Sequence, residues 1–119
     1  MKNYVIIGGS SGIGNELVKI IEKQGDNIIA TYNSNEIQSR ENVQYFKFDV
    51  NQDVLPLENL PDEIDGLVYC PGAINLKPFT RFKEEDFIED FKFQVLGATR
   101  IIQHILPNLK KSGNASIVL

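Results

Sequence analysis

The stretch that decides the fold is residues 4–14, YVIIGGSSGIG. It opens with a continuous apolar and largely β-branched run, which is typical of a strand buried on both faces of a parallel sheet. Glycines then recur over residues 8–14 with the spacing G-x-x-x-G-x-G. Over residues 13–24 apolar side chains recur at helical spacing, and Gly25 follows where helix ends favour glycine. The pattern predicts a strand, a glycine turn and a helix.

The rest of the chain continues this alternation. Short β-rich runs follow at residues 27–31, 43–48, 66–69 and 116–119. The longest helical pattern starts at the acidic residues 84–86, and we expect Pro107 to bend or end it. Its apolar residues step along one face: Phe87, Phe91, Val95, Ala98, Ile102 and Ile105. Strands that alternate with helices predict an α/β fold, a Rossmann-type doubly wound parallel sheet with helices on both faces.

The last strand-like run, at residues 116–119, is of the type buried on both faces. Such a strand needs further elements to cover it, yet the sequence stops inside it. We therefore expect residues 1–119 to be the N-terminal part of a larger domain, truncated in the fifth strand.

Composition restricts the classes of function. The 119 residues contain 12 Lys plus Arg and 16 Asp plus Glu, which gives a net charge of −4, and 42% are hydrophobic. This fits one soluble domain with no basic tract for nucleic acid or an anionic membrane. One cysteine, Cys70, and one histidine, His104, cannot form an internal disulfide or a four-ligand metal site. The N-terminus has no signal-peptide pattern, so we expect a cytoplasmic protein.

The glycine turn has the arrangement of a dinucleotide-binding loop. In such a loop Gly8 permits the tight reversal, Gly12 lets backbone N–H groups approach a pyrophosphate, and Gly14 lets helix and strand pack closely. The phosphates then lie at the positive end of the helix dipole. The hydroxyls of Ser10 and Ser11 would add phosphate or ribose contacts. The alternative is a turn with a purely structural role.

The same residues also fit a serine hydrolase. Residues 8–12 spell G-x-S-x-G, the nucleophile elbow, with Ser10 as nucleophile and His104 as a base later in the chain. An elbow, however, follows several strands of its sheet, whereas nothing precedes the first strand here. We therefore favour dinucleotide binding and interpret His104 as a helix residue.

Further landmarks follow the glycine turn in order. They are DV at 49–50, LVYCPGA at 67–73, QVLG at 94–97, LP at 106–107 and SIV at 116–118. Together with the turn, they resemble the short-chain dehydrogenase/reductase family from Tyr4 to Leu119. The resemblance implies an oxidoreductase that uses NAD(P)(H) to interconvert a carbonyl and an alcohol by hydride transfer. It also implies a homo-oligomer packed through the long helices, and a small carbonyl or alcohol substrate.

The resemblance assigns roles to individual positions. Cofactor phosphates would lie at Gly8, Ser10, Ser11, Gly12 and Ile13, and Gly14 would allow helix packing. The adenosine ribose would lie by Thr31, Tyr32 and Asn33, and the adenine by Asp49 and Val50. The part of the cofactor between adenine and nicotinamide would lie above Cys70, Pro71 and Gly72. Gln94 stands at the family's helix asparagine, which helps to hold a proton-relay water. The alternatives are that Asp49 caps a strand end and that Cys70 is a small buried filler.

The sequence departs from the family pattern in two places besides Gln94. Ile7 stands where the family often has threonine, and residues 69–72, YCPG, replace Asn-Asn-Ala-Gly. Cofactor type depends on the end of the second strand, where an acid would favour NAD. Residues 31–34 are TYNS and no acid occurs before Glu36, which favours NADP, with Arg40 in the following loop as the cation that could reach its phosphate.

The family's catalytic residues are missing from this stretch. A Tyr-x-x-x-Lys motif supplies the acid/base, but none of the four tyrosines has lysine four residues on. The catalytic serine would fall beyond Leu119. We therefore expect these residues to be the cofactor-binding half of a reductase, inactive alone. The alternative is a non-catalytic dinucleotide-binding module, and the substrate is not predicted.

Overall fold

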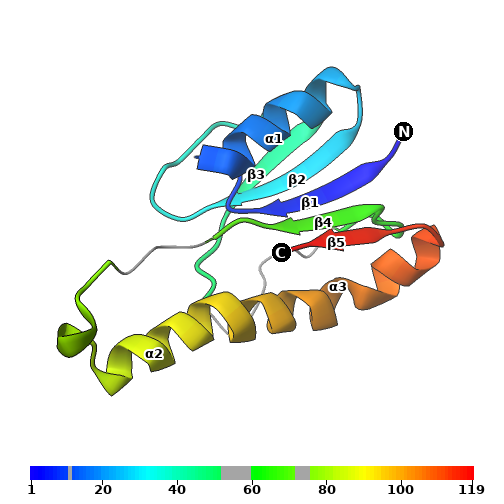
Figure 1. Ribbon diagram of the computed structural model, residues 1–119. Coiled ribbons are helices and arrows are strands. Elements are labelled where there is room, and N and C mark those ends of the chain that lie inside the picture. The colour runs from blue at the N-terminus through cyan, green and yellow to red at the C-terminus, as the bar shows by residue number, and fades with distance from the viewer. Residues whose placement is uncertain (11, 52–59, 72–75) are drawn as a thin grey trace.

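The computed structural model describes residues 1–10, 12–51, 60–71 and 76–119. Within them five parallel strands form one sheet in the order β3-β2-β1-β4-β5 (Figure 1). The strands are β1 Asn3–Ile7, β2 Asn27–Tyr32, β3 Val43–Lys47, β4 Gly66–Tyr69 and β5 Ser116–Val118. The chain winds outward from β1 to β3, then returns to place β4 on the other side of β1. This confirms the doubly wound parallel sheet, with a topological switch point between β1 and β4.

Helices cover both faces of the sheet. Helix α1, Gly12–Lys23, lies on one face, and helix α3, Gly97–Ser112, lies on the other (Figure 1). Successive residues of β1 point to opposite faces, so Ile6 packs in the core under α1 while Val5 and Ile7 pack in the core with α3. All three are at most 1% exposed. The central strand is therefore buried on both faces, as its unbroken apolar run predicts.

The long helical region has three consecutive parts: α2, Glu84–Phe91; a π-helical segment, η2, Lys92–Leu96; and α3. A short 3₁₀ turn, η1, Phe79–Arg81, precedes them. The prediction for Pro107 is wrong in part, because α3 continues through it to Ser112. Ile105 and Leu109 on either side are buried against the sheet, and this packing holds both turns despite the missing N–H. Gly113, at φ +75°, ends the helix.

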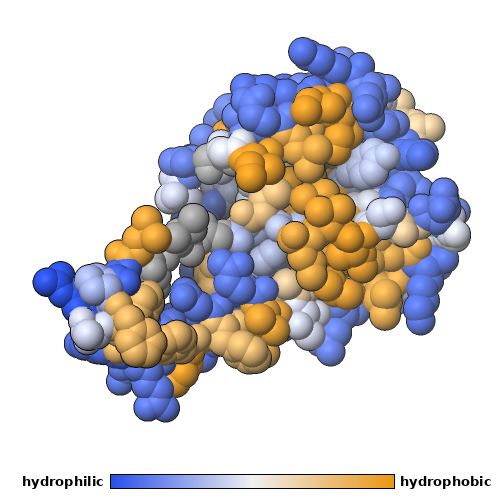
Figure 2. Space-filling view, in the orientation of Figure 1, coloured by the Kyte–Doolittle hydropathy of each residue, from blue (hydrophilic) through white to orange (hydrophobic). Residues whose placement is uncertain are grey.

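Two apolar surfaces are exposed within the described residues. The first half of the helical face is exposed, with Phe87 57% and Phe91 53% accessible, whereas Ala98 and Ile105 are buried. Strand β5 is also exposed, with Ile117 42% and Val118 56% accessible, because it is an edge strand that pairs only with β4 among the described strands. Figure 2 shows apolar surface over β5 and along α1.

Candidate functional site

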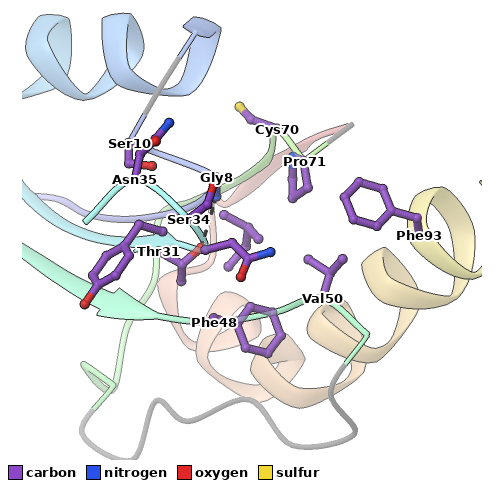
Figure 3. A pocket seen from close by; sticks show the side chains of 13 residues that line it. Gly8, Ser10, Thr31, Ser34, Asn35, Phe48, Val50, Cys70, Pro71 and Phe93 are labelled. Atoms are coloured by element: carbon purple, nitrogen blue, oxygen red, sulfur yellow. Dashed lines mark hydrogen bonds between the residues drawn. The ribbon is translucent and has the colours of Figure 1, made fainter. Parts of the chain in front are cut away.

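A cleft of about 230 Å³ lies beyond the carboxyl ends of the strands, at the switch point (Figure 3). Ligands of open α/β sheets bind at this place. The lining comes from four strand ends and the long helix: Ile7, Gly8 and Ser10; Thr31, Tyr32, Asn33, Ser34 and Asn35; Phe48 and Val50; Cys70 and Pro71; and Phe93. Residues from distant parts of the sequence, from Ile7 to Phe93, thus line one cleft.

The cleft gathers most of the predicted cofactor residues. Those in its lining are Gly8, Ser10, Thr31, Tyr32, Asn33, Val50, Cys70 and Pro71, whereas Gly12, Ile13, Gly14, Asp49 and Gln94 are not among the lining residues. Ser11 and Gly72 lie outside the described residues. The carboxylate of Asp49 accepts a hydrogen bond from the Asn51 backbone N–H at 2.9 Å, as expected for a residue that caps a strand end.

Sequence reasoning missed five lining residues, which are Ile7, Ser34, Asn35, Phe48 and Phe93. Ser34 and Asn35 continue the polar run after β2, so extending that run by two residues finds them. Ile7 and Phe48 end their strand-like runs. No sequence pattern indicates that Phe93 lines the cleft, because its position depends on how the long helix crosses the sheet.

The glycine turn has the geometry that its spacing predicts. Gly8 has φ +82° and Gly12 has φ +57°, both in the left-handed region that favours glycine. A Cβ on Gly14 would stand 2.0 Å from the Gly8 carbonyl oxygen, so only glycine lets α1 pack this closely on the turn. A Cβ on Gly12 would meet nothing within 4 Å. Of the three glycines, Gly12 therefore borders open space at the start of α1.

Thr31 holds the turn from the neighbouring strand. Its Oγ1 accepts a hydrogen bond from the Gly8 backbone N–H at 3.0 Å, which Figure 3 draws as a dashed line. The Gly9 N–H donates to the Thr31 carbonyl oxygen at 2.9 Å. Thr31 is 1% exposed. The Thr31 hydroxyl, expected beside a ribose, is thus bonded to the glycine turn.

The end of β4 is held by a tyrosine, Tyr69. The Tyr69 hydroxyl donates to the Phe93 carbonyl oxygen of the π-helical segment at 2.5 Å, and burial raises the pKa of Tyr69 to about 12. A Cβ on Gly97 would stand 2.7 Å from the same hydroxyl oxygen. Gln94 of this segment is exposed, while the neighbouring Phe93 lines the cleft. Tyr69 thus connects β4 to the helix that carries the predicted relay residue.

The electrostatics of the cleft are mild. No side chain in the described lining carries a formal charge at neutral pH, and burial raises the pKa of the Cys70 thiol, so it stays protonated. Arg40 does not extend toward the end of β2. Its guanidinium donates to both carboxylate oxygens of Glu22 on α1, at 2.6 and 3.1 Å, and these hydrogen bonds lower the pKa of Glu22.

The structure gives no support to the hydrolase alternative. His104 is exposed on α3 and is not among the residues that line the cleft with Ser10. Among the described residues, no cluster of three or more His, Cys, Asp or Glu side chains could hold a metal ion. In the same part of the chain, no helix is both long and apolar enough to cross a membrane.

Comparison with known families decides the relationship. A family model described as short chain dehydrogenase matches residues 2–119. The chain belongs to the short-chain dehydrogenase family. A search of curated protein sequences found no match. The order of the strands and the position of the glycine turn in this short-chain dehydrogenase chain agree with the family assignment.

Solved structures share the fold. A short chain dehydrogenase family protein from Francisella tularensis superposes with a TM-score of 0.80 at 25% identity, over 98% of this chain and 49% of that one. A short chain dehydrogenase from Leptospira borgpetersenii with bound NAD+ superposes with a TM-score of 0.80 at 24% identity, over 98% of this chain and 49% of that one. A short-chain dehydrogenase/reductase structure from Burkholderia multivorans with bound NADP superposes with a TM-score of 0.75 at 15% identity, over 91% of this chain and 54% of that one. The chain thus spans about half the length of these structures.

Proposed function

We propose that this chain binds a nicotinamide dinucleotide in the cleft, as the cofactor-binding part of an oxidoreductase that interconverts a carbonyl and an alcohol. The observation that carries the proposal is the glycine turn at the start of α1. Gly12 combines a positive φ with open space where a Cβ would point. A phosphate needs such backbone access at a helix N-terminus, where the helix dipole favours negative charge.

The residues around the cleft fit the remainder of the cofactor. Tyr32, Asn33 and Ser34 would border the adenosine ribose, Val50 the adenine, and Cys70 and Pro71 the central part. When bound, the nicotinamide accepts or donates the hydride. The protein's part here is to bind and orient, because Thr31 holds the glycine turn and Tyr69 joins the end of β4 to the helix beside the cleft. The proton-transfer residues belong to the family's Tyr-x-x-x-Lys motif, which this sequence does not contain.

We propose NADP(H) as the preferred cofactor. The lining residues after β2 are Asn33, Ser34 and Asn35, none of which is acidic, so nothing in the described lining repels a ribose 2′-phosphate. Because Arg40 is paired with Glu22, the preference rests on polar donors rather than on a dedicated cation. We expect it to be modest, on the order of tenfold.

A second candidate function is a cytoplasmic dinucleotide-binding module without catalysis, for which the residues that line the cleft would be sufficient. In both cases we propose a homo-oligomer, because Phe87, Phe91 and Val95 expose an apolar stripe on α2 and η2. Light scattering after size-exclusion chromatography measures this. A monomer at micromolar concentration would refute the oligomer.

The test of dinucleotide binding is calorimetric titration of this chain with NADP+ and NAD+. Gly12→Asp is the variant, because aspartate tolerates positive φ and brings a negative charge to the proposed phosphate site. Gly25→Asp is the matched control, since Gly25 also has positive φ and open space but lies at the other end of α1. We expect binding to be lost in G12D and kept in G25D. Equal affinity in both variants, or no binding by the unaltered chain, would refute the proposal.

A further inference from the structure

Apart from the tyrosines, Thr31 is the one polar side chain that is buried in the part of the chain that the structure describes. A buried hydroxyl costs free energy unless it is hydrogen-bonded, so its partner identifies what it does. That partner is the Gly8 N–H, at 3.0 Å. Gly8 belongs to the glycine turn and not to the strand that carries Thr31. The hydroxyl therefore connects β2 to the turn.

The connection extends to the start of α1. The Gly8 carbonyl oxygen is the atom that a Cβ on Gly14 would meet at 2.0 Å, so the Gly8 peptide packs directly on the helix. The Gly9 N–H is held as well, by the Thr31 carbonyl oxygen at 2.9 Å. Thr31 thus fixes two successive amides of the turn, and through Gly8 it fixes how the first turn of α1 sits on β1.

We propose that the Thr31 hydroxyl is a positioning group for phosphate binding: it sets the orientation of the glycine turn and does not itself contact the ribose. The amides of Gly8 and Gly9 are occupied by β2, so the amides that serve a ligand follow them in the chain. This inference rests on the proposed dinucleotide site. It also explains how the turn is held although Ile7, next to Gly8, offers no hydroxyl.

Thr31→Val removes the hydroxyl at nearly constant volume, and Thr31→Ser retains it. Thr99→Val is the matched control, because the Thr99 hydroxyl is also hydrogen-bonded to the backbone, as donor to the Val95 carbonyl oxygen at 2.7 Å, but lies exposed on α3. Calorimetric titration with NADP+ should show a Kd about tenfold higher for T31V, and within about twofold of the parent for T31S and T99V.

A phosphate-free probe separates positioning from ribose contact. Adenosine, titrated at millimolar concentration by NMR, should bind T31V as it binds the parent chain, because only the phosphate geometry changes. Hydrogen exchange of the Gly8 amide in ligand-free protein should be faster in T31V and unchanged in T31S. An equal loss of adenosine and NADP+ affinity would overturn the proposal, because it would place the hydroxyl on the nucleoside.

The outcomes separate this inference from the proposed function. If the parent chain binds NADP+ and T31V binds it equally, only the role of Thr31 fails. If the parent chain binds no dinucleotide, the proposed function fails. Should T31V not fold, Thr31→Ala replaces it: affinity lost in T31A and kept in T31S supports the proposal, and equal affinity in both overturns it.

Discussion

Two strand ends border the cleft side by side, those of β1 and β4, and they are held in different ways. The turn after β1 depends on its own glycines, with positive φ at Gly8 and backbone contact at Gly14. The end of β4 is held instead by a side chain, because the Tyr69 hydroxyl donates to the Phe93 carbonyl oxygen. The two strand ends touch, because a Cβ on Gly8 would lie 3.1 Å from the Pro71 nitrogen. Close backbone packing at the glycine turn and a side-chain hydrogen bond at the end of β4 thus shape the same side of the cleft.

The largest effect should come from the backbone-built turn. Gly14→Ala places a Cβ against the Gly8 carbonyl, and because that atom is backbone, α1 must move. We expect a loss of about 3 kcal/mol of unfolding free energy, as for severe overpacking, measured by urea denaturation. Gly25→Ala is the control, since its Cβ meets nothing and only the positive φ of 84° costs about 1 kcal/mol. Equal losses would show that close packing at Gly14 is not what the turn requires.

Substitution beside Tyr69, at the end of β4, should cost less unfolding free energy. The cost should also depend on whether the Tyr69 hydroxyl is present. Gly97→Ala brings a methyl group to within 2.7 Å of the Tyr69 hydroxyl and should displace it from the Phe93 carbonyl. We expect a loss of about 1 to 2 kcal/mol, since the hydroxyl of the buried Tyr69 loses its hydrogen bond. In a Tyr69→Phe background the same substitution should cost less, because the hydroxyl is already gone. A double-mutant cycle measures the difference, and additive losses would contradict the contact.

This contrast explains what the sequence could predict. The strands, α1 and the Gly8–Gly14 turn follow from local patterns, because apolar runs and glycine spacing act within a few residues. The bond from Tyr69 to η2 joins groups 24 residues apart, and no local pattern indicates it. The exposure of β5 and of Phe91 follows a related rule, since exposure depends on what packs against an element and not on its own hydrophobicity.

Thr31 shows the limit most clearly. Its place at the end of β2 predicted a residue of the cleft, and it does line the cleft. Its hydroxyl, however, is bonded to Gly8, which is 23 residues away in sequence and adjacent only because β1 and β2 pair in parallel. Position in a motif thus predicts location better than it predicts the partner of a side chain.

Alkylation of Cys70, which directly follows β4, tests how firmly this part of the cleft is closed in the unaltered protein. Burial raises the pKa of its thiol, so the reactive thiolate is scarcer at any given pH than in an exposed cysteine. We expect alkylation by iodoacetamide at pH 7.5 to be about tenfold slower than in the urea-unfolded chain. The alkylation rate should keep rising with pH above the range in which an ordinary cysteine thiol titrates, because the pKa of Cys70 is raised. Because Cys70 is the sole cysteine, mass spectrometry follows it directly, and equal rates in folded and unfolded protein would mean that this part of the cleft opens freely.

The smallest effect should come from Glu22→Gln, which tests whether Arg40 matters to either strand end. The ion pair is partly exposed, with side chains 38% and 31% accessible, and pairs of this kind contribute at most about 1 kcal/mol. The pair fastens the loop between β2 and β3 to α1, away from the cleft lining, so NADP+ affinity should stay within about twofold of the parent. Affinity that rises tenfold would mean that Glu22 withholds Arg40 from the ribose phosphate. The polar run after β2 would then be only part of what selects the cofactor.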